Sequence, residues 1–240
     1  MKKYNEGYWA SRSSQYNKTN WVKNKELINY FLKMLPNRSY NQILEVGIGT
    51  GAVAEQVVQN IGPLIGIDIS KDMIEKIENP LITTYVGDAH KLQFEDKKFD
   101  LIYMRNVIHY IDSPESVFSE IYRCLKPGAQ FLFSQVVPPS DSLSEEYDQL
   151  IGRDIHYPTQ KEILKWLNMF TIMQKNEFIL KDQSIMNWLN NTCSDESQKL
   201  KIIARHKSTS EKYKSLVNYY EENDDIFVDI KHFMVSFEKG

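Results

Sequence analysis

Short apolar segments alternate with longer amphipathic segments between residues 42 and 134. The short segments are rich in Ile, Leu, Val and Phe, as buried strands are, and the longer ones repeat apolar residues at helical spacing. Strands are predicted at 42–46, 64–67, 82–86, 99–104 and 130–134, with helices at about 51–60, 71–78 and 114–125. This alternation indicates an α/β fold, a parallel sheet with helices on both faces and ligands at the carboxyl ends of its strands.

The pattern changes after residue 134, where a long polar connection begins. Two further strands are predicted at 171–180 and 226–237, and two further helices at 142–151 and from Thr159 to about Met169. Helical patterns with polar breaks fill residues 184–221 between the two strands. If these strands form a hairpin, residues 184–221 are an insertion, and an insertion on a compact sheet is usually a lid or an interaction surface.

The segment before the first strand is expected to cover the ligand site. Residues 21–35 carry apolar side chains near helical spacing and end at Pro36, which favours a helix. We therefore expect an aromatic segment and helix over 1–35, a ligand-binding core over 36–137, and a C-terminal part of the sheet with a helical lid over 138–240.

A glycine-rich turn follows the first strand. Gly47, Gly49 and Gly51 come directly after the apolar residues 43–46, and helix-forming residues follow. Such a turn allows backbone N–H groups to approach a ligand closely. The spacing also satisfies the dinucleotide-binding fingerprint, so this turn alone leaves the nucleoside-type cofactor open. The carboxylate of Glu45 argues against a pyrophosphate and favours a cation, because like charges repel.

Further polar residues end the next strands. Asp68, at the end of the second strand, fits a contact with a ribose diol in either kind of cofactor. Asp88, in Gly87-Asp88-Ala89 after the third strand, offers a carboxylate to an adenine amino group. Lys126-Pro127-Gly128 is predicted as a turn before the fifth strand.

Taken in order, these motifs resemble the class I S-adenosylmethionine-dependent methyltransferases of the ubiquinone/menaquinone-biosynthesis type. The resemblance runs from Gln42 to Ser134. It implies a Rossmann-like, seven-stranded, mostly parallel sheet with helices on both faces and a helical lid between the last two strands. It also implies S-adenosylmethionine as the cofactor and no metal.

The resemblance implies where the cofactor lies. The glycine turn passes beneath the methionine and ribose, Asp68 holds the ribose hydroxyls, and Asp88 accepts a hydrogen bond from the adenine amino group. The remaining expected contacts are Glu45 near the polar end of the cofactor, Ile69 beside the adenine, a backbone contact from Ala89, and Arg105 under the methionine part, facing the acceptor.

Methyl transfer from a sulfonium depends mainly on alignment and on exclusion of water, sometimes with a base. His109 is the first candidate for such a base, because it follows the fourth strand where the acceptor pocket begins and a histidine titrates near neutral pH. His156 is the second candidate and is expected to line the same pocket. The alternative for His109 is packing or hydrogen bonding in a loop.

Aromatic residues are further candidates. Tyr16 is expected to shield the sulfonium by a cation–π contact, and Trp9 and Trp188 are expected to line the acceptor pocket. The alternatives are an anchor for the N-terminal segment and a core residue of the insertion. His90, His206 and His232 are expected to be surface or core residues.

Composition limits the partners. The net charge of −3 and the scattered Lys and Arg residues give no reason to expect nucleic acid. Cys124 and Cys193 have no metal-ligand spacing and are expected to be reduced in a cytoplasmic protein. No apolar stretch of about 18 residues is present, so no membrane partner is expected.

We expect methyl transfer to an N, O or C nucleophile of a small molecule. A methyltransferase acting on a protein or RNA and a non-catalytic regulatory protein that binds S-adenosylmethionine remain alternatives, as does an NAD-dependent enzyme. Against base methylation, the loop after the fourth strand reads Arg105-Asn106-Val107 and lacks the Pro-Pro-aromatic motif of such enzymes. The acceptor and the oligomeric state, monomer or homodimer, stay open.

Overall fold

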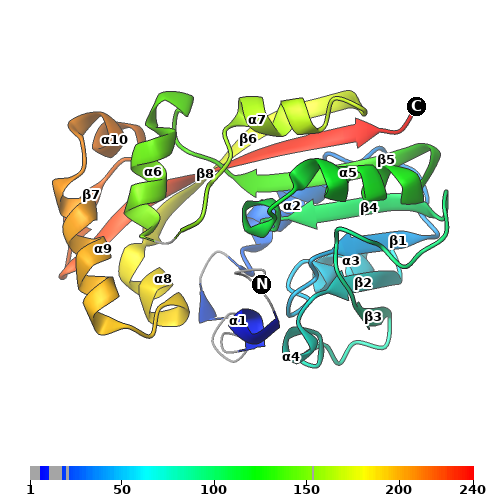
Figure 1. Cartoon of the computed structure of the whole chain (residues 1–240), viewed down its shortest axis with the longest axis horizontal. Helices are drawn as coiled ribbons and strands as arrows, with labels where there is room; N and C mark the ends of the chain where they lie inside the picture. The colour runs from blue at the N-terminus through cyan, green and yellow to red at the C-terminus, as the bar shows by residue number, and fades with distance from the viewer. Residues whose placement is uncertain (1–5, 11–17, 20–21, 153) are drawn as a thin grey trace.

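A central sheet joins both halves of the chain in the computed structural model, which describes residues 6–10, 18–19, 22–152 and 154–240 (Figure 1). The strand order is β3-β2-β1-β4-β5-β8-β6, and β7 pairs with β8. The strands are β1 Ile43–Val46, β2 Leu64–Asp68, β3 Ile82–Val86, β4 Phe99–Arg105, β5 Leu125–Val136, β6 Thr171–Ser184, β7 Tyr220–Glu222 and β8 Asp225–Glu238. Strands β1 to β5 are parallel, whereas β8 is antiparallel to β5, β6 and β7.

Helices cover both faces of this sheet, and others lie in a separate lobe. They are α1 Glu6–Ala10, α2 Lys25–Leu32, α3 Ala54–Asn60, α4 Lys71–Ile74, α5 Pro114–Cys124, α6 Ser144–Ile151, α7 Gln160–Trp166, α8 Ile185–Thr192, α9 Glu196–Ser208 and α10 Glu211–Leu216, with the 3₁₀ turns η2 Ile108–Tyr110 and η3 Asp141–Leu143. The predicted α/β class with a seven-stranded, mostly parallel sheet is confirmed, and β7 is an additional short strand. The division of the chain at residues 36 and 138 stays a prediction.

Several predicted boundaries are wrong; the helix predicted over 71–78, for example, ends at Ile74. The helix predicted over 21–35 is shorter, since α2 begins after Asn24, whose side chain accepts a hydrogen bond from the N–H of Leu27. The turn predicted at Lys126–Gly128 lies inside β5, at an irregularity where the register between β4 and β5 shifts from Phe99 to Leu101.

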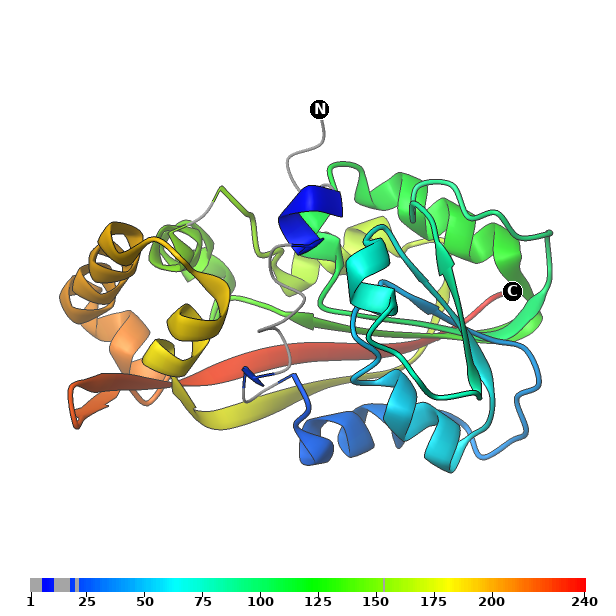
Figure 2. The same cartoon turned by 90° about the horizontal axis from the view of Figure 1, so that it is seen from below.

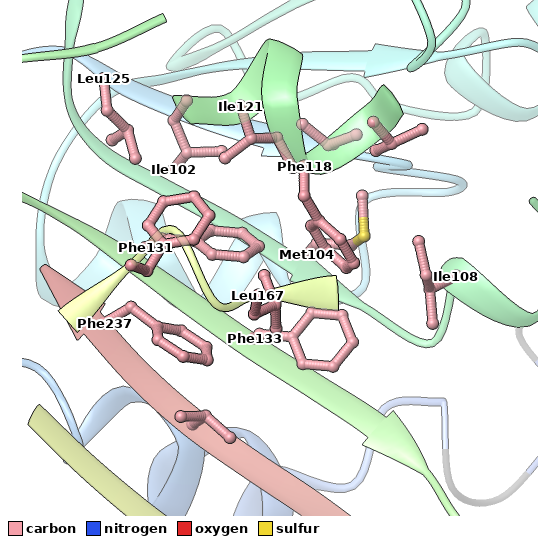
Figure 3. Packing of buried hydrophobic residues seen from close by; sticks show 14 of the residues in the cluster. Ile102, Met104, Ile108, Phe118, Ile121, Leu125, Phe131, Phe133, Leu167 and Phe237 are labelled. Atoms are coloured by element: carbon pink, nitrogen blue, oxygen red, sulfur yellow. The ribbon is translucent and has the colours of Figure 1, made fainter. Parts of the chain in front are cut away.

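Aromatic side chains fill the core between α5 and the sheet (Figure 3). The ring of Phe118 on α5 lies 6.0 Å from that of Phe131 and 5.7 Å from that of Phe133, both on β5. A second buried cluster on the other sheet face joins α2 and α3, including Leu27, to Leu101 and neighbouring strand residues. Helices thus cover both faces of the parallel strands, including β1, which leads into the glycine turn.

A third buried cluster lies outside the parallel sheet. It joins α6, α8, α9 and α10 to the first residues of β8. Figures 1 and 2 show these four helices as a separate lobe, into which the long strands β6 and β8 extend. We call α6, α8, α9 and α10 the helical lobe.

The core predicts the effect of one substitution. Phe118→Ala removes a side chain with no exposed surface, and we expect it to lower the free energy of unfolding by about 3–5 kcal/mol. Leu200→Ala on α9, where Leu200 is 66% exposed, is the control and should change it by less than about 0.5 kcal/mol. Urea denaturation followed by circular dichroism measures both, and equal effects would contradict this account of the core.

Candidate functional site

The turn after β1 packs directly against the segment after β4. Gly47 has φ +76°, and a Cβ there would lie 2.3 Å from Cγ2 of Val107. The N–H groups of Gly47 and Ile48 donate to the carbonyl oxygen of Ile67, at 2.8 and 3.1 Å. Position 47 therefore requires glycine for its conformation and for the close approach of Val107.

Asp68 links the glycine turn to the segment after β2. Its Oδ2 accepts from the N–H of Gly49 at 2.8 Å, and its Oδ1 accepts from the N–H of Ser70 at 2.9 Å. Burial raises the pKa of this carboxyl, and these backbone hydrogen bonds oppose the rise. The carboxylate is held in one orientation at the end of the strand, with its charge partly satisfied by the backbone.

The first of two cavities lies at the carboxyl ends of β1, β2 and β3. We call it the strand-end cavity; its volume of about 110 Å³ is several times the roughly 10–15 Å³ that a water molecule needs. Its lining includes Trp9, Gly47, Gly49, Asp68, Ile69, Met73, Asp88, Ala89, Arg105, Asn106 and Tyr110. The structure thus brings together most of the residues predicted to contact the cofactor. Gly51 and Glu45 are outside this lining.

The second cavity, of about 130 Å³, lies between the sheet and the helical lobe, and we call it the lobe cavity. Its lining includes Glu45, Gly47, Gly49, Arg105, Asn106, His109, Tyr110, Tyr147, Tyr157, Trp188, His206, Tyr213, Val228, Ile230 and His232. The two cavities share Gly47, Gly49, Arg105, Asn106 and Tyr110. A ligand in one cavity therefore borders the other.

Glu45 is a buried acid at this border. It is 3% exposed, and its Oε2 accepts from the hydroxyl of Tyr103 at 2.7 Å. Burial raises the pKa of Glu45 to about 8; the Tyr103 hydrogen bond and the charge of Arg105 lower it, and the charge of Asp68 raises it. At neutral pH the carboxyl is mostly protonated, and a ligand cation beside it would favour its ionisation.

Arg105 and Asn106 form the border itself. The Nη1 of Arg105 donates to the carbonyl oxygen of Val22 at 3.0 Å. Asn106 has φ +54°, and its Oδ1 accepts from the N–H of Val136 at 3.0 Å. Asparagine tolerates this left-handed conformation better than most residues, so it permits the sharp bend after β4. Sequence reasoning gave Asn106 no role.

His109 lines the lobe cavity, beside Tyr157, with the ring centroids 4.6 Å apart. The side-chain amide of Gln135 lies 2.9 Å from Nδ1 of His109, with its nitrogen as donor. In the neutral ring the proton is therefore on Nε2, which makes His109 a hydrogen-bond donor in this arrangement. Its role as a base stays a prediction.

His156 lies in a separate surface hollow and does not line the lobe cavity. Its Nδ1 is 2.7 Å from Asp148, and its Nε2 is 3.3 Å from Glu162. Burial lowers the pKa of His156, but the hydrogen bond to Asp148 and the charges of both acids raise it overall. Its partners link α6 to α7, which indicates a structural role in place of the predicted pocket role.

The structure places the predicted aromatic residues in different positions. Trp9 lines the strand-end cavity rather than the lobe cavity, edge-on to Tyr110 with ring centroids 4.6 Å apart. Trp188 on α8 is 6% exposed and lines the lobe cavity. Tyr16 lies outside the described residues.

Sequence reasoning missed the two histidines of the lobe cavity. His206 comes from α9 and His232 from β8, and both were expected to be surface or core residues. Val228, Ile230 and His232 alternate along one face of β8, and all three line the cavity. The available signal was the polar residue His232 in an alternation of apolar residues along β8. Whether such a residue faces a cavity depends on the helical lobe packed over the strand.

The described part of the chain shows neither a metal-binding cluster nor a membrane-spanning helix. No group of three His, Cys, Asp or Glu side chains there is placed to hold a metal ion. None of the helices in those ranges is both long and apolar enough to cross a bilayer.

Comparisons with known proteins point to one family. A family model described as a methyltransferase domain matches residues 44–133, from β1 into β5. The chain is 25% identical to the uncharacterized methyltransferase YcgJ of Bacillus subtilis over 195 residues, covering 77% of this chain and 74% of that protein. It matches phosphoethanolamine N-methyltransferase 2 of Caenorhabditis elegans at 28% identity over 142 residues, 56% of this chain, but spans only 32% of that protein.

Solved structures share the fold. A putative methyltransferase from Bacillus halodurans has a TM-score of 0.79 at 20% identity, over 88% of this chain and 98% of that chain. Phosphoethanolamine N-methyltransferase 2 of Haemonchus contortus, solved with S-adenosylmethionine, has a TM-score of 0.64 at 18% identity, over 95% of this chain and 57% of that one. The match to a methyltransferase domain covers residues 44–133, which include the loops of the strand-end cavity, and the chain shares the fold of these solved methyltransferases, one of them solved with S-adenosylmethionine.

Proposed function

We propose that this chain methylates an N, O or C nucleophile of a small molecule. The observation that carries the proposal is the meeting of two cavities at Arg105 and Asn106, one lined by strand-end carboxylates and the other by aromatic residues of the lobe. The lobe cavity is partly enclosed by four helices, which suits a small acceptor better than a macromolecular surface. Both cysteines are buried and unpaired, which fits a reducing compartment such as the cytoplasm.

The residues present fit S-adenosylmethionine. Asp68 offers a carboxylate for the ribose hydroxyls, and Ile69 and Met73 offer apolar surface for an adenine. Asp88 also lines this cavity, although its Oδ1 already accepts from the N–H of His90 at 3.0 Å. Glu45, buried beside Arg105, would become negatively charged when a sulfonium or ammonium group binds next to it.

The cofactor supplies an activated methyl group when it is bound. The chain's own residues orient the two ligands and exclude water. Trp9 and Tyr110 cover the strand-end cavity, and Trp188 covers the lobe cavity. Arg105 lies at the border, where methyl donor and acceptor would meet.

Loss of the Asp68 charge tests the cofactor site. Asp68→Asn should weaken binding of S-adenosylhomocysteine at least about tenfold in calorimetric titration, because a carboxylate hydrogen-bonded to a hydroxyl is worth about 1.5–3 kcal/mol. Asp72→Asn removes the same charge from an exposed position on α4 and serves as the control. Equal affinity of the two variants, or no binding by the wild type, would contradict the assignment.

The buried acid predicts a dependence on pH. The pKa of Glu45 is about 8 in the folded protein and 4.5 without burial, as in the unfolded chain. Between pH 4.5 and 8 the unfolded chain therefore binds fewer protons than the folded protein. The free energy of unfolding of the ligand-free protein should therefore fall as pH rises through this window, by up to about 1.4 kcal/mol per pH unit. Glu45→Gln should remove this part of the slope, as measured by urea denaturation at several pH values.

Cofactor binding should show the opposite trend. A cationic ligand favours ionised Glu45, so S-adenosylmethionine should bind more tightly to the wild type as pH rises toward about 8. The difference between the pH profiles of cofactor affinity for the wild type and Glu45→Gln isolates the contribution of Glu45. Asp68, whose pKa is also raised by burial, contributes equally to both profiles. Parallel pH profiles for the two proteins would refute the role of Glu45.

A further inference from the structure

Two buried histidines face the lobe cavity from opposite sides. His232 on β8 has no exposed surface, and His206 on α9 is 2% exposed. Neither ring nitrogen of either residue has a hydrogen-bond partner among the described protein atoms. Buried polar groups are nearly always hydrogen-bonded in native proteins, so two such rings lining one cavity point to a ligand that satisfies them.

The sheet register places His232 near the site of transfer. It pairs with Val136, while Ser134, two residues earlier on β5, pairs with Arg105 on β4. Since side chains alternate between faces, His232 and Arg105 project from the same face of the sheet. The positive charge of Arg105 also lowers the pKa of His232, so the two groups are close. His232 is therefore on the cavity floor beside the border.

Both rings are neutral at physiological pH. Burial lowers the pKa of His206 to about 4. Burial and the charge of Arg105 hold the pKa of His232 well below its usual range. Each neutral imidazole presents one N–H donor and one nitrogen lone pair.

The rest of the lining disfavours an anionic acceptor. Arg105 is the one Lys or Arg among the described residues that line the cavity, and its guanidinium already donates to Val22. The carboxylate of Asp229 accepts from the N–H of Asp182 at 3.0 Å and from the side chain of Asn218 at 2.7 Å. Most other lining residues are aromatic or aliphatic. A phosphate would find no pair of cations there.

We propose, resting on the proposed methyltransferase function, that the acceptor is an uncharged, largely apolar molecule whose O–H or N–H nucleophile donates to His232 and whose second polar group binds His206. In the transfer the nucleophile's lone pair forms the bond to the methyl carbon, the carbon–sulfur bond leaves its electron pair on sulfur, and the nucleophile's proton passes to the lone-pair nitrogen of His232. His232 then returns this proton to water that enters the lobe cavity when the product leaves.

His232 suits this role better than His109. The Nδ1 of His109 accepts a hydrogen bond from the Gln135 amide, whereas neither nitrogen of His232 has a protein partner. A low pKa keeps His232 unprotonated until transfer. When the positive charge of the sulfonium disappears on transfer, the pKa of the nearby imidazole rises, which favours its uptake of the proton.

Binding of simple probes tests the acceptor class. The protein, labelled with nitrogen-15 histidine and saturated with S-adenosylhomocysteine, is titrated with phenol and 2-naphthol and, separately, with phenyl phosphate and 2-naphthyl phosphate. We expect a neutral probe to shift the ring-nitrogen signals of His232, and the phosphates to bind at least about tenfold more weakly. His232→Phe and His206→Phe assign the signals and should each weaken binding of the neutral probe, while His156→Gln, outside the cavity, should not.

The possible outcomes separate the two proposals. Failure of S-adenosylhomocysteine to bind the wild type would overturn the proposed function and this inference together. Normal cofactor binding with no response of His232 to any neutral probe, or tighter binding of the phosphates, would overturn the acceptor class alone. Because the wild-type spectra need no variant, a poorly folded His232→Phe protein does not block the test, and cofactor affinity reports the folding of each variant.

Discussion

The site depends on the close contact between the turn after β1 and the segment after β4. With no Cβ at Gly47, Val107 can pack onto the turn, and the carboxylate of Asp68 accepts a hydrogen bond from the N–H of Gly49 in the same turn. These contacts fix the carboxyl ends of β1, β2 and β4 relative to one another. Both cavities are lined by Gly47 and Gly49. The same contact therefore sets the distance between a ligand in the strand-end cavity and a ligand in the lobe cavity. Alignment of two ligands is what an in-line displacement needs most from a protein.

The charges at the border suit a bound cation. Burying an ionised carboxylate is costly, and Glu45 avoids most of this cost by staying protonated near neutral pH. Arg105 projects from the same face as Glu45 and donates to the carbonyl oxygen of Val22. A bound sulfonium or ammonium would change this balance by ionising Glu45. Ligand charge and protein protonation are therefore linked at this residue.

The fold and the strand-end cavity were largely predictable, and the lobe cavity was not. Residues 43–51, Asp68 and Asp88 are close in sequence to the strands that position them, so local pattern and topology together placed them at one edge of the sheet. His206 lies on helix α9 of the insertion, and His232 lies on β8, the last strand. Tertiary packing brings these two residues to one cavity. His156 was predicted to line the pocket and does not. Its neighbour Tyr157 lines the lobe cavity, while the ring of His156 turns toward Asp148 and Glu162.

The chain separates binding of the cofactor from selection of the acceptor. The strand-end cavity lies almost wholly within the segment from β1 to η2, while the roof of the lobe cavity comes from helices that follow β5 and have their own buried cluster. Helices with an independent core can change their inner side chains without disturbing the glycine turn. Strand β8 is the exception, because it pairs with β5 in the sheet and also carries Val228, Ile230 and His232 along the cavity floor. A residue on β8 is held in place by the pairing of this strand with β5. A proton acceptor must be held in this way, within hydrogen-bond reach of the proton that it accepts.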